Sequence, residues 1–283
     1  DGLKHAITAE TTMTTISAGN PMAALELFSM NNEVVIVTGA AGGLGCELAR
    51  ILAAANANVV LVDINENGLT ELSDELTSQG FSTTAKVCDI TNSQSIETLV
   101  QDVDSQYQRI DGLVNCAGIL GSNDYMFNIA ADEWDAVMKI NLKATWQMST
   151  CIAAYMITKS IHGRIVNISS SLGGRAQLKR IHYATSKAGV EHLTRNMAME
   201  LVKKNIRVNC LAPGWLATPM VKEILDGPEG EHWRRTIPMG RAADPEELTG
   251  ALLLLASRAS SYMTGSVLRV DGGYSYRGIE CDF

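Results

Sequence analysis

Short apolar runs alternate along this chain with longer segments in which apolar residues recur every three or four positions. The first pattern predicts buried parallel strands, and the second predicts helices packed against them. The predicted strands are 33–38, 58–62, 82–87, 111–115, 163–169, 206–211 and 266–270. The predicted helices are 44–56, 66–79, 93–107, 131–158, 182–203 and 245–257. This alternation favours a single α/β domain over 31–283, with a doubly wound parallel sheet of about seven strands flanked by helices.

The composition limits the classes of function. With 283 residues, 46% of them apolar, the chain can bury a large core. Its net charge of −8 does not favour binding to nucleic acid or to an anionic membrane. The longest apolar cluster, 251–256, is much shorter than the ~18–20 residues that a membrane span needs. Six widely spaced cysteines indicate reduced core residues of a cytoplasmic protein, and the five histidines lack metal-ligand spacing, so no metal is expected.

Residues 1–30 form an N-terminal extension outside this alternation. They are rich in Thr and lack Arg, and they contain no unbroken apolar segment. They therefore match neither a secretory signal nor an Arg-rich transit peptide. A vector-derived leader and a native extension are both open, and the stretch 21–30 is expected to form a short helix.

A glycine-rich turn follows the first predicted strand. Gly39, Gly43 and Gly45 lie at GxxxGxG spacing, and Leu44 begins the helical pattern. A strand, a tight turn and a helix start bring backbone N–H groups and the positive end of a helix dipole to a pyrophosphate. On this motif alone, a turn without any ligand is the alternative.

The second predicted strand ends in an acid. Asp63 lies roughly 20 residues beyond the glycine turn, where a dinucleotide fold places the carboxylate that binds the adenosine ribose. Such a carboxylate accepts hydrogen bonds from the diol of NAD and repels the 2′-phosphate of NADP. No Lys or Arg occurs from Gly39 to Gly45 or directly after Asp63, so NAD is the expected cofactor. A solvated acid at a strand end is the alternative.

Three residues in the middle of the chain have the chemistry of a proton-transfer site. Ser170 follows the strand 163–169, at the sheet edge where open α/β folds bind ligands. Tyr183 and Lys187 are four residues apart and share one helix face, so the ammonium group can stabilise a phenolate. We expect Tyr183 to take a proton as a hydride leaves, and Ser170 to hold the substrate oxygen. An ordinary surface pair is the alternative for Tyr183 and Lys187 taken alone.

These motifs resemble the short-chain dehydrogenase/reductase family, and the resemblance extends from about Glu33 to Tyr274. It implies a Rossmann fold, and it implies that Asn141 completes a proton relay through a water to Lys187. The catalytic residues are then Asn141, Ser170, Tyr183 and Lys187. The expected cofactor-binding residues are Gly39, Gly43, Leu44, Gly45, Asp63, Asp89, Ile90, Asn115, Ala117, Gly118, Tyr183, Lys187, Pro213, Gly214 and Thr218. Cys116 departs from the family's usual second Asn, and no His or acid is visibly placed to activate its thiol, so we expect it to pack.

The expected function is an NAD(H)-dependent oxidoreductase that interconverts a secondary alcohol, such as a polyol, sugar or sugar acid, and its ketone. A 3-oxoacyl-[acyl-carrier-protein] reductase is the nearest alternative, although Asp63 argues against the usual NADPH dependence of that role. A non-enzymatic NAD-sensing relative is the distant alternative, and the intact catalytic residues argue against it.

Three loops are expected to line the substrate pocket: 119–127, 172–182 and 215–239. The middle loop contains Arg175, Lys179, Arg180 and His182. An inward orientation of one of them favours an acidic or heavily hydroxylated small molecule, and solvated loop charges are the alternative.

The resemblance also implies a homo-oligomer. Helices 131–158 and 182–203 are expected to pair across a two-fold axis through small or apolar residues: Ala144, Met148, Ala153, Met197 and Ala198. The segment 267–274 is expected to form a second interface, which gives a tetramer of D2 symmetry. Packing of these residues against their own sheet is the alternative.

Overall fold

The computed structural model describes residues 21–276 apart from 219–220, 222–224 and 229, so most of the N-terminal extension lies outside the described residues. The strands form one parallel sheet in the order β3-β2-β1-β4-β5-β6-β7, which confirms the doubly wound fold class. Their bounds are β1 Val34–Thr38, β2 Asn58–Asp63, β3 Thr83–Val87, β4 Gly112–Asn115, β5 Arg164–Ile168, β6 Arg207–Pro213 and β7 Val267–Val270.

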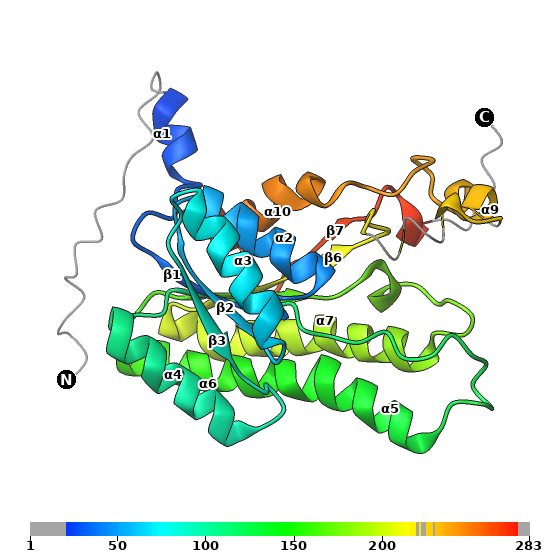
Figure 1. The fold of residues 1–283 in the computed structure, drawn as a ribbon, viewed down its shortest axis with the longest axis horizontal. Helices are drawn as coiled ribbons and strands as arrows, with labels where there is room; N and C mark the ends of the chain where they lie inside the picture. The colour runs from blue at the N-terminus through cyan, green and yellow to red at the C-terminus, as the bar shows by residue number, and fades with distance from the viewer. Residues whose placement is uncertain (1–20, 219–220, 222–224, 229, 277–283) are drawn as a thin grey trace, which may run out of the picture.

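Helices cover both faces of the sheet (Figure 1). Their bounds are α1 Pro21–Glu26, α2 Gly43–Ala54, α3 Glu66–Ser78, α4 Ser93–Tyr107, α5 Ala131–Met138, α6 Ala144–Thr158, α7 Ile181–Leu201, α9 Gly230–Thr236 and α10 Thr249–Ala256. Side chains of β1 alternate between two cores, because successive residues of a strand point to opposite faces. Val35 and Val37 pack with α2, α3 and α10, whereas Val34 and Ile36 pack with α4, α6 and α7.

The strand order reverses at β1. This strand pairs with β2 on one side and with β4 on the other, and Thr38 and Asn115 are register partners at the carboxyl ends. Because the loops after β1 and β4 lead to opposite faces, a crevice opens between them. The glycine turn begins on one side of this crevice, and the segment Cys116–Gly118 begins on the other.

The sequence-based helix 131–158 is wrong in one respect. α5 and α6 are separated by a π-helical turn, Lys139–Lys143, and the side chain of Asn141 in this turn is buried. Such turns inside helices occur frequently at functional sites. The prediction also missed α9, and the last predicted helix begins instead with a 3₁₀ turn, Pro245–Leu248.

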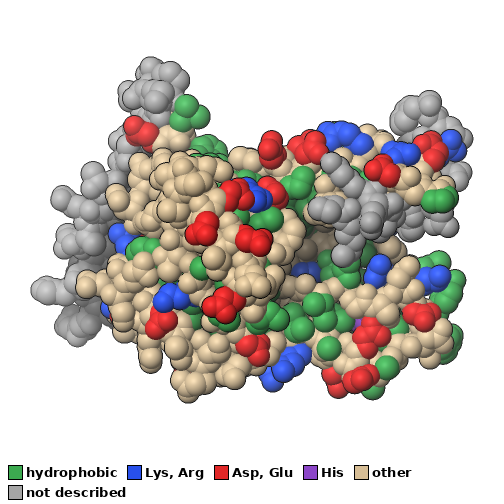
Figure 2. Space-filling model, in the orientation of Figure 1, with side chains coloured by type: hydrophobic (Ala, Val, Ile, Leu, Met, Phe, Trp, Pro, Cys, Tyr) green, Lys and Arg blue, Asp and Glu red, His purple; other side chains and the backbone are tan. Residues whose placement is uncertain are grey.

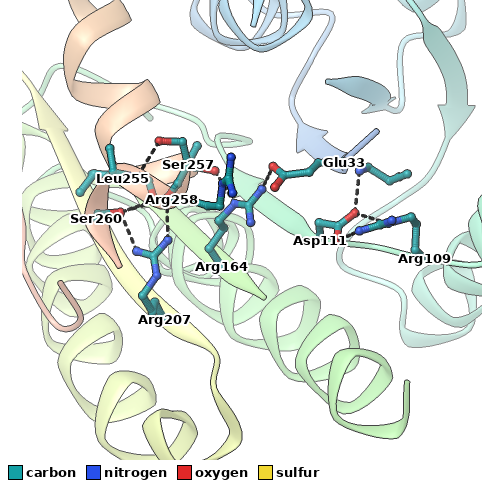
Figure 3. Close-up of polar contacts among 12 residues, drawn as sticks. Glu33, Arg109, Asp111, Arg164, Arg207, Leu255, Ser257, Arg258 and Ser260 are labelled. Atoms are coloured by element: carbon teal, nitrogen blue, oxygen red, sulfur yellow. Dashed lines mark hydrogen bonds and ion pairs between the residues drawn. The ribbon is translucent and has the colours of Figure 1, made fainter. Parts of the chain in front are cut away.

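Arginines at the amino ends of β5 and β6 hold the end of α10 (Figure 3). Arg164 pairs with Glu33 and donates to the carbonyl of Ala256. Arg207 donates to the carbonyl of Ser257 at 2.9 Å. These bonds satisfy carbonyls that a helix end leaves without partners, at the sheet edge opposite the crevice.

The residues expected at the two-fold interface lie elsewhere. Ala144, Met148, Ala153, Met197 and Ala198 are at most 8% exposed, and all of them belong to the core beneath the sheet. That expectation is wrong for these five residues, because the helix faces that carry them cover the sheet of their own chain. The outward side of the same helices exposes other residues, including Trp146, which is 48% exposed. No helix of the described residues is long and apolar enough to cross a membrane.

Candidate active site

The glycine turn after β1 requires glycine at two of its positions. Gly39 has a φ of +71°, and a β-carbon there would lie 2.7 Å from the Cα of Ala117. A β-carbon on Gly45 would overlap the carbonyl oxygen of Gly39. At Gly43, in contrast, the nearest atom to an added β-carbon is Thr218 Cγ2 at 3.7 Å. The turn is therefore tightly packed at Gly39 and Gly45 and open at Gly43. The first N–H groups of α2 are available to an anion at this open position.

A groove of about 330 Å³ runs from this turn across the carboxyl ends of β1, β2 and β4. Asp63 lies in the groove and accepts backbone hydrogen bonds from Ala41 at 3.1 Å and from Ile64 at 2.8 Å. Asp89 also lines it, and hydrogen bonds from Thr91 hold the pKa of the Asp89 carboxyl below its usual value. The described residues that line this groove include no Lys or Arg.

Among the other residues expected to bind the cofactor, Leu44, Ile90, Ala117 and Gly118 also line the groove. Asn115 has a different position. Its Nδ2 donates to Ser149 Oγ at 2.8 Å and to Asn167 Oδ1 at 2.9 Å, inside the protein. The side chain of Asn115 therefore holds β4 to β5 and α6 below the site.

A second cavity, of about 320 Å³, adjoins the groove, because Leu44 lines both. It contains three of the residues expected to bind the cofactor: Pro213, Gly214 and Thr218. Ser170 and Tyr183 lie in the same cavity. The structure thus brings the two hydroxyl groups together next to the groove that begins at the glycine turn.

Lys187 lies behind Tyr183 on α7. Its Nζ donates to the carbonyl of Ile168 at 2.9 Å and lies 5.7 Å from the centre of the Tyr183 ring. The side chain is almost fully buried. A buried cation therefore lies next to the Tyr183 ring.

Asn141 uses its whole side-chain amide within the protein. Oδ1 accepts from the backbone N–H of Ile119 at 2.8 Å, and Nδ2 donates to the Ile119 carbonyl at 2.9 Å. Asn141 and Lys187 also converge on Gly118, where an added β-carbon would lie 3.1 Å from Asn141 Oδ1 and 3.5 Å from Lys187 Nζ. Asn141 therefore fixes the loop after β4 to the π-helical turn, close to Lys187 of α7.

Comparisons with known proteins agree with this geometry. A family model described as enoyl-(acyl carrier protein) reductase matches residues 39–275. The chain is 37% identical to the 3-oxoacyl-[acyl-carrier-protein] reductase of Thermotoga maritima, covering 86% of this chain and 98% of the relative. It is 34% identical to an NAD-dependent glycerol dehydrogenase of Listeria innocua, covering 88% and 96%. A gluconate 5-dehydrogenase from Burkholderia cenocepacia, solved with NADP and tartrate, superposes with a TM-score of 0.85 at 32% identity, covering 90% and 100%.

The chain belongs to the short-chain dehydrogenase/reductase family. As a member of this family it is an oxidoreductase that acts on an alcohol or its ketone. The match covers the glycine turn, the Ser170 strand end and the Tyr183–Lys187 helix.

The second cavity of the enzyme is lined by residues of the loops expected to form the substrate pocket, including Gln177, Trp215 and Val221, and also by Tyr274, which was not assigned to it from the sequence. Tyr274 is almost fully buried, donates to Gln177 Oε1 at 2.9 Å and meets the Trp215 ring edge-on at 6.2 Å between centroids. The positions of Gln177, Trp215 and Val221 in these loops were the signal that placed them in the pocket. Tyr274 had none, because it is 91 residues from Tyr183 along the chain.

The four charged or titratable residues expected in the loop 172–182 occupy different environments. Arg175 lies over the Tyr274 ring at 4.2 Å, and Lys179 lies over the Tyr125 ring at 4.8 Å. His182 is fully buried with Nε2 at 3.2 Å from Glu133. Of the four, only Arg180 is among the described residues that line the cavity.

Cys116 lies in the groove that also contains the glycine turn and Asp63. Burial raises the pKa of its thiol to about 12, so the thiol remains protonated at neutral pH. This agrees with a packing role. Among the described residues, no group of three or more His, Cys, Asp or Glu side chains is arranged to hold a metal ion.

Proposed function

We propose that this enzyme is an NAD(H)-dependent oxidoreductase that interconverts a secondary alcohol and its ketone, with Tyr183 as the general acid and base. The observation that carries the proposal is the shared cavity of Ser170 and Tyr183, which adjoins a groove containing Asp63. A polyol, a sugar and a sugar acid all present a suitable carbinol.

Each of the three side chains Ser170, Tyr183 and Lys187 has a different role in alcohol oxidation. Ser170 Oγ holds the substrate oxygen, and Tyr183 Oη removes its proton as the C–H bond breaks. Lys187, fixed by the Ile168 carbonyl, stabilises the resulting phenolate. A nicotinamide cofactor, when bound, supplies the hydride acceptor. The proton then leaves through Lys187 and a water held near Asn141, as the family resemblance implies.

The preference for NAD rests on Asp63. Its carboxylate is held in place by backbone N–H groups at the rim of the groove, where a 2′-phosphate would meet a like charge. Like charges in contact cost several kcal/mol, which corresponds to a factor of ~100 or more in affinity. Relatives of both kinds support a nicotinamide cofactor, since one is named NAD-dependent and another was solved with NADP.

The test compares initial rates with NAD⁺ and NADP⁺ across a panel of secondary alcohols, polyols and sugar acids. We expect kcat/KM to favour NAD⁺ by ~100-fold or more. Asp63→Asn keeps one oxygen acceptor for the backbone and removes the charge, so the preference should narrow by at least ~10-fold. Equal use of both cofactors by the unmodified enzyme would show that Asp63 does not select NAD.

A 3-oxoacyl-[acyl-carrier-protein] reductase is the second candidate. The cavity has an apolar part, which includes Leu120, Leu172 and Leu216, and the identity with the Thermotoga maritima enzyme supports this activity. Hydrophobic side chains are also visible on the surface of the molecule (Figure 2). In the loop between β4 and α5, Tyr125 and Phe127 are exposed. Reduction of acetoacetyl-CoA with NADH and NADPH separates the two candidates, because a polyol or sugar-acid dehydrogenase should leave this thioester almost unreduced.

We further propose that the enzyme forms a homotetramer. The outward side of α5, α6 and α7 carries a broad hollow of about 1040 Å³ lined by Leu142, Trp146 and Leu193, among other residues. The half-exposed Trp146 in this open hollow supports association with a second copy across a two-fold axis.

A further inference from the structure

Arg180 is the last residue before α7, three positions ahead of Tyr183, and it lines the same cavity. One nitrogen of its guanidinium group, Nη1, donates to the carbonyls of Gly121 and Ser122, both at 3.2 Å. Within the described part of the chain, Nε and Nη2 have no hydrogen-bond partner and no acid lies within ion-pairing distance of the group. The guanidinium is therefore held at one corner and has further donors available.

The described lining of the cavity carries positive charge only. Its described lining residues contain Arg180 as the one cation and include no Asp or Glu. The neighbouring cations Arg175 and Lys179 lie over tyrosine rings instead. Gln177 accepts from the Tyr274 hydroxyl through Oε1, which leaves its amide nitrogen as a second donor in the cavity. Such a cavity favours an anionic substrate that also carries hydrogen-bonding groups.

We propose that Arg180 binds the carboxylate of a hydroxy-acid substrate and thereby selects it over neutral alcohols, a role that rests on the oxidoreductase function proposed above. A planar guanidinium with two free donor positions matches a carboxylate, which accepts paired N–H bonds. Arg180 and Tyr183 line one cavity of about 320 Å³. The carboxylate and the reacting carbinol therefore belong to one small molecule, with a few carbon atoms between them. Hydroxyl groups on those carbons can accept from Gln177.

The kinetic test uses a matched pair of substrates: gluconate and glucitol, which differ at one end by a carboxylate in place of a CH₂OH group. Arg180→Gln should lower kcat/KM for gluconate by about 10- to 100-fold, mainly through KM, because a charge-assisted hydrogen bond is lost. The value for glucitol should change less than about threefold. Arg180→Lys should recover part of the loss. Lys179→Gln removes a charge from the same loop but outside the cavity. It should leave kcat/KM unchanged for both gluconate and glucitol.

Arg180 also supports the loop at Gly121, so a purely structural role has to be distinguished. If Arg180→Gln lowers kcat/KM equally for gluconate and glucitol, the carboxylate role is overturned. A wild-type enzyme that oxidises glucitol but not hydroxy acids would overturn it as well, and would leave the proposed oxidoreductase function intact.

A binding measurement separates this inference from the reaction itself. Calorimetric titration of the enzyme–NADH complex with tartrate and gluconate should show binding that Arg180→Gln weakens by at least about tenfold. If this binding occurs while no alcohol is oxidised with NAD⁺, the anion site stands and the proposed reaction fails. If no hydroxy acid binds the complex, the role of Arg180 is overturned whatever the turnover.

Discussion

Asn141 donates to Ser186 Oγ at 3.0 Å, and this bond joins the π-helical turn to the helix that carries Tyr183 and Lys187. Ser186 in turn donates to the carbonyl of Tyr183 at 2.7 Å. Because the same amide also pairs with both backbone groups of Ile119, one buried side chain connects the π-helical turn, α7 and the loop after β4. Asn141 therefore holds the helix that carries Tyr183 and Lys187 in place through its side chain, and its backbone carbonyl accepts from Thr145 Oγ1 at 2.8 Å.

Replacing Asn141 tests this positioning role. Asn141→Ala leaves the backbone groups of Ile119 without their partners, so the free energy of unfolding should fall by about 1–3 kcal/mol in urea denaturation. We expect kcat to fall by at least ~10-fold while the Kd for NADH changes less than threefold, because the groove keeps its lining. A variant with reduced stability but normal kcat would show that the amide supports the fold alone.

The role of Tyr183 can be tested with one oxygen atom. Tyr183→Phe keeps the ring in place and removes the group that exchanges the proton, so kcat should fall by ~10²–10⁴-fold in steady-state assays. The affinity for NADH, measured by fluorescence, should remain near normal. Tyr262→Phe is the matched control, since the Tyr262 side chain is fully exposed, and it should change neither quantity. Substantial turnover by Tyr183→Phe would mean that another residue transfers the proton.

Two glycines of the same turn should fail in different ways when replaced by alanine. Gly39→Ala forces a side chain into a left-handed conformation and against Ala117, so both stability and NADH binding should be lost, with a cost of at least about 1–3 kcal/mol. Gly43→Ala meets no atom closer than 3.7 Å, and alanine is the better helix former by ~1 kcal/mol. We therefore expect Gly43→Ala to keep or gain thermal stability while NADH binds at least ~10-fold more weakly. Normal NADH affinity in Gly43→Ala would move the pyrophosphate away from this turn.

The parts of the site that follow from local chemistry were predicted from the sequence. Glycines at a strand-to-helix turn and a Tyr and Lys one helical turn apart depend on spacing alone. The structure places the glycines and Tyr183 around two adjoining cavities, with Lys187 buried next to the Tyr183 ring. The π-helical turn at Lys139–Lys143 was not predicted, because the apolar pattern on both sides continues as helix. Arg180 was named as one of four candidates, and its orientation depends on carbonyls at Gly121 and Ser122 that lie far away in sequence.

The interface residues show a different limit of sequence reasoning. Ala144 and Met148 have the small or apolar character of a helix interface, but they are fully buried against their own sheet. α6 has apolar residues on two sides, so composition does not tell which side faces the sheet. Tertiary packing decides it, because the register of the sheet determines which residues of α6 point inward.

Buried thiols should make the folded enzyme sensitive to alkali. Burial raises the pKa of Cys210 from 9.0 to about 12, so the unfolded chain loses this proton first as the pH rises above 9. The contribution of the protonated Cys210 thiol to the free energy of unfolding is therefore fully present below about pH 9 and is lost as the pH rises toward 12. Urea unfolding at pH 8 and pH 10.5 should show a smaller loss for Cys210→Ala than for the unmodified protein. An equal loss in both proteins would assign the alkaline sensitivity to other groups.

The tetramer proposal predicts a mass near four times the 30.4 kDa chain in light scattering at micromolar concentration. Trp146 is half-exposed in the hollow over α5, α6 and α7, and Trp146→Glu places a charge where a second copy would bury it. We expect this variant to form dimers, because the second interface near β7 remains. Val87→Glu is the control, since Val87 is similarly exposed at the end of β3, and it should leave the mass unchanged.

The outcomes separate the two interfaces from each other. A dimer in the unmodified protein that Trp146→Glu converts to a monomer would mean that the helical face associates and the β7 face does not. A dimer unaffected by Trp146→Glu would mean the opposite. A mass of one chain in the unmodified protein refutes the proposal, because the exposed surface over α5, α6 and α7 would then remain open to solvent at micromolar concentration.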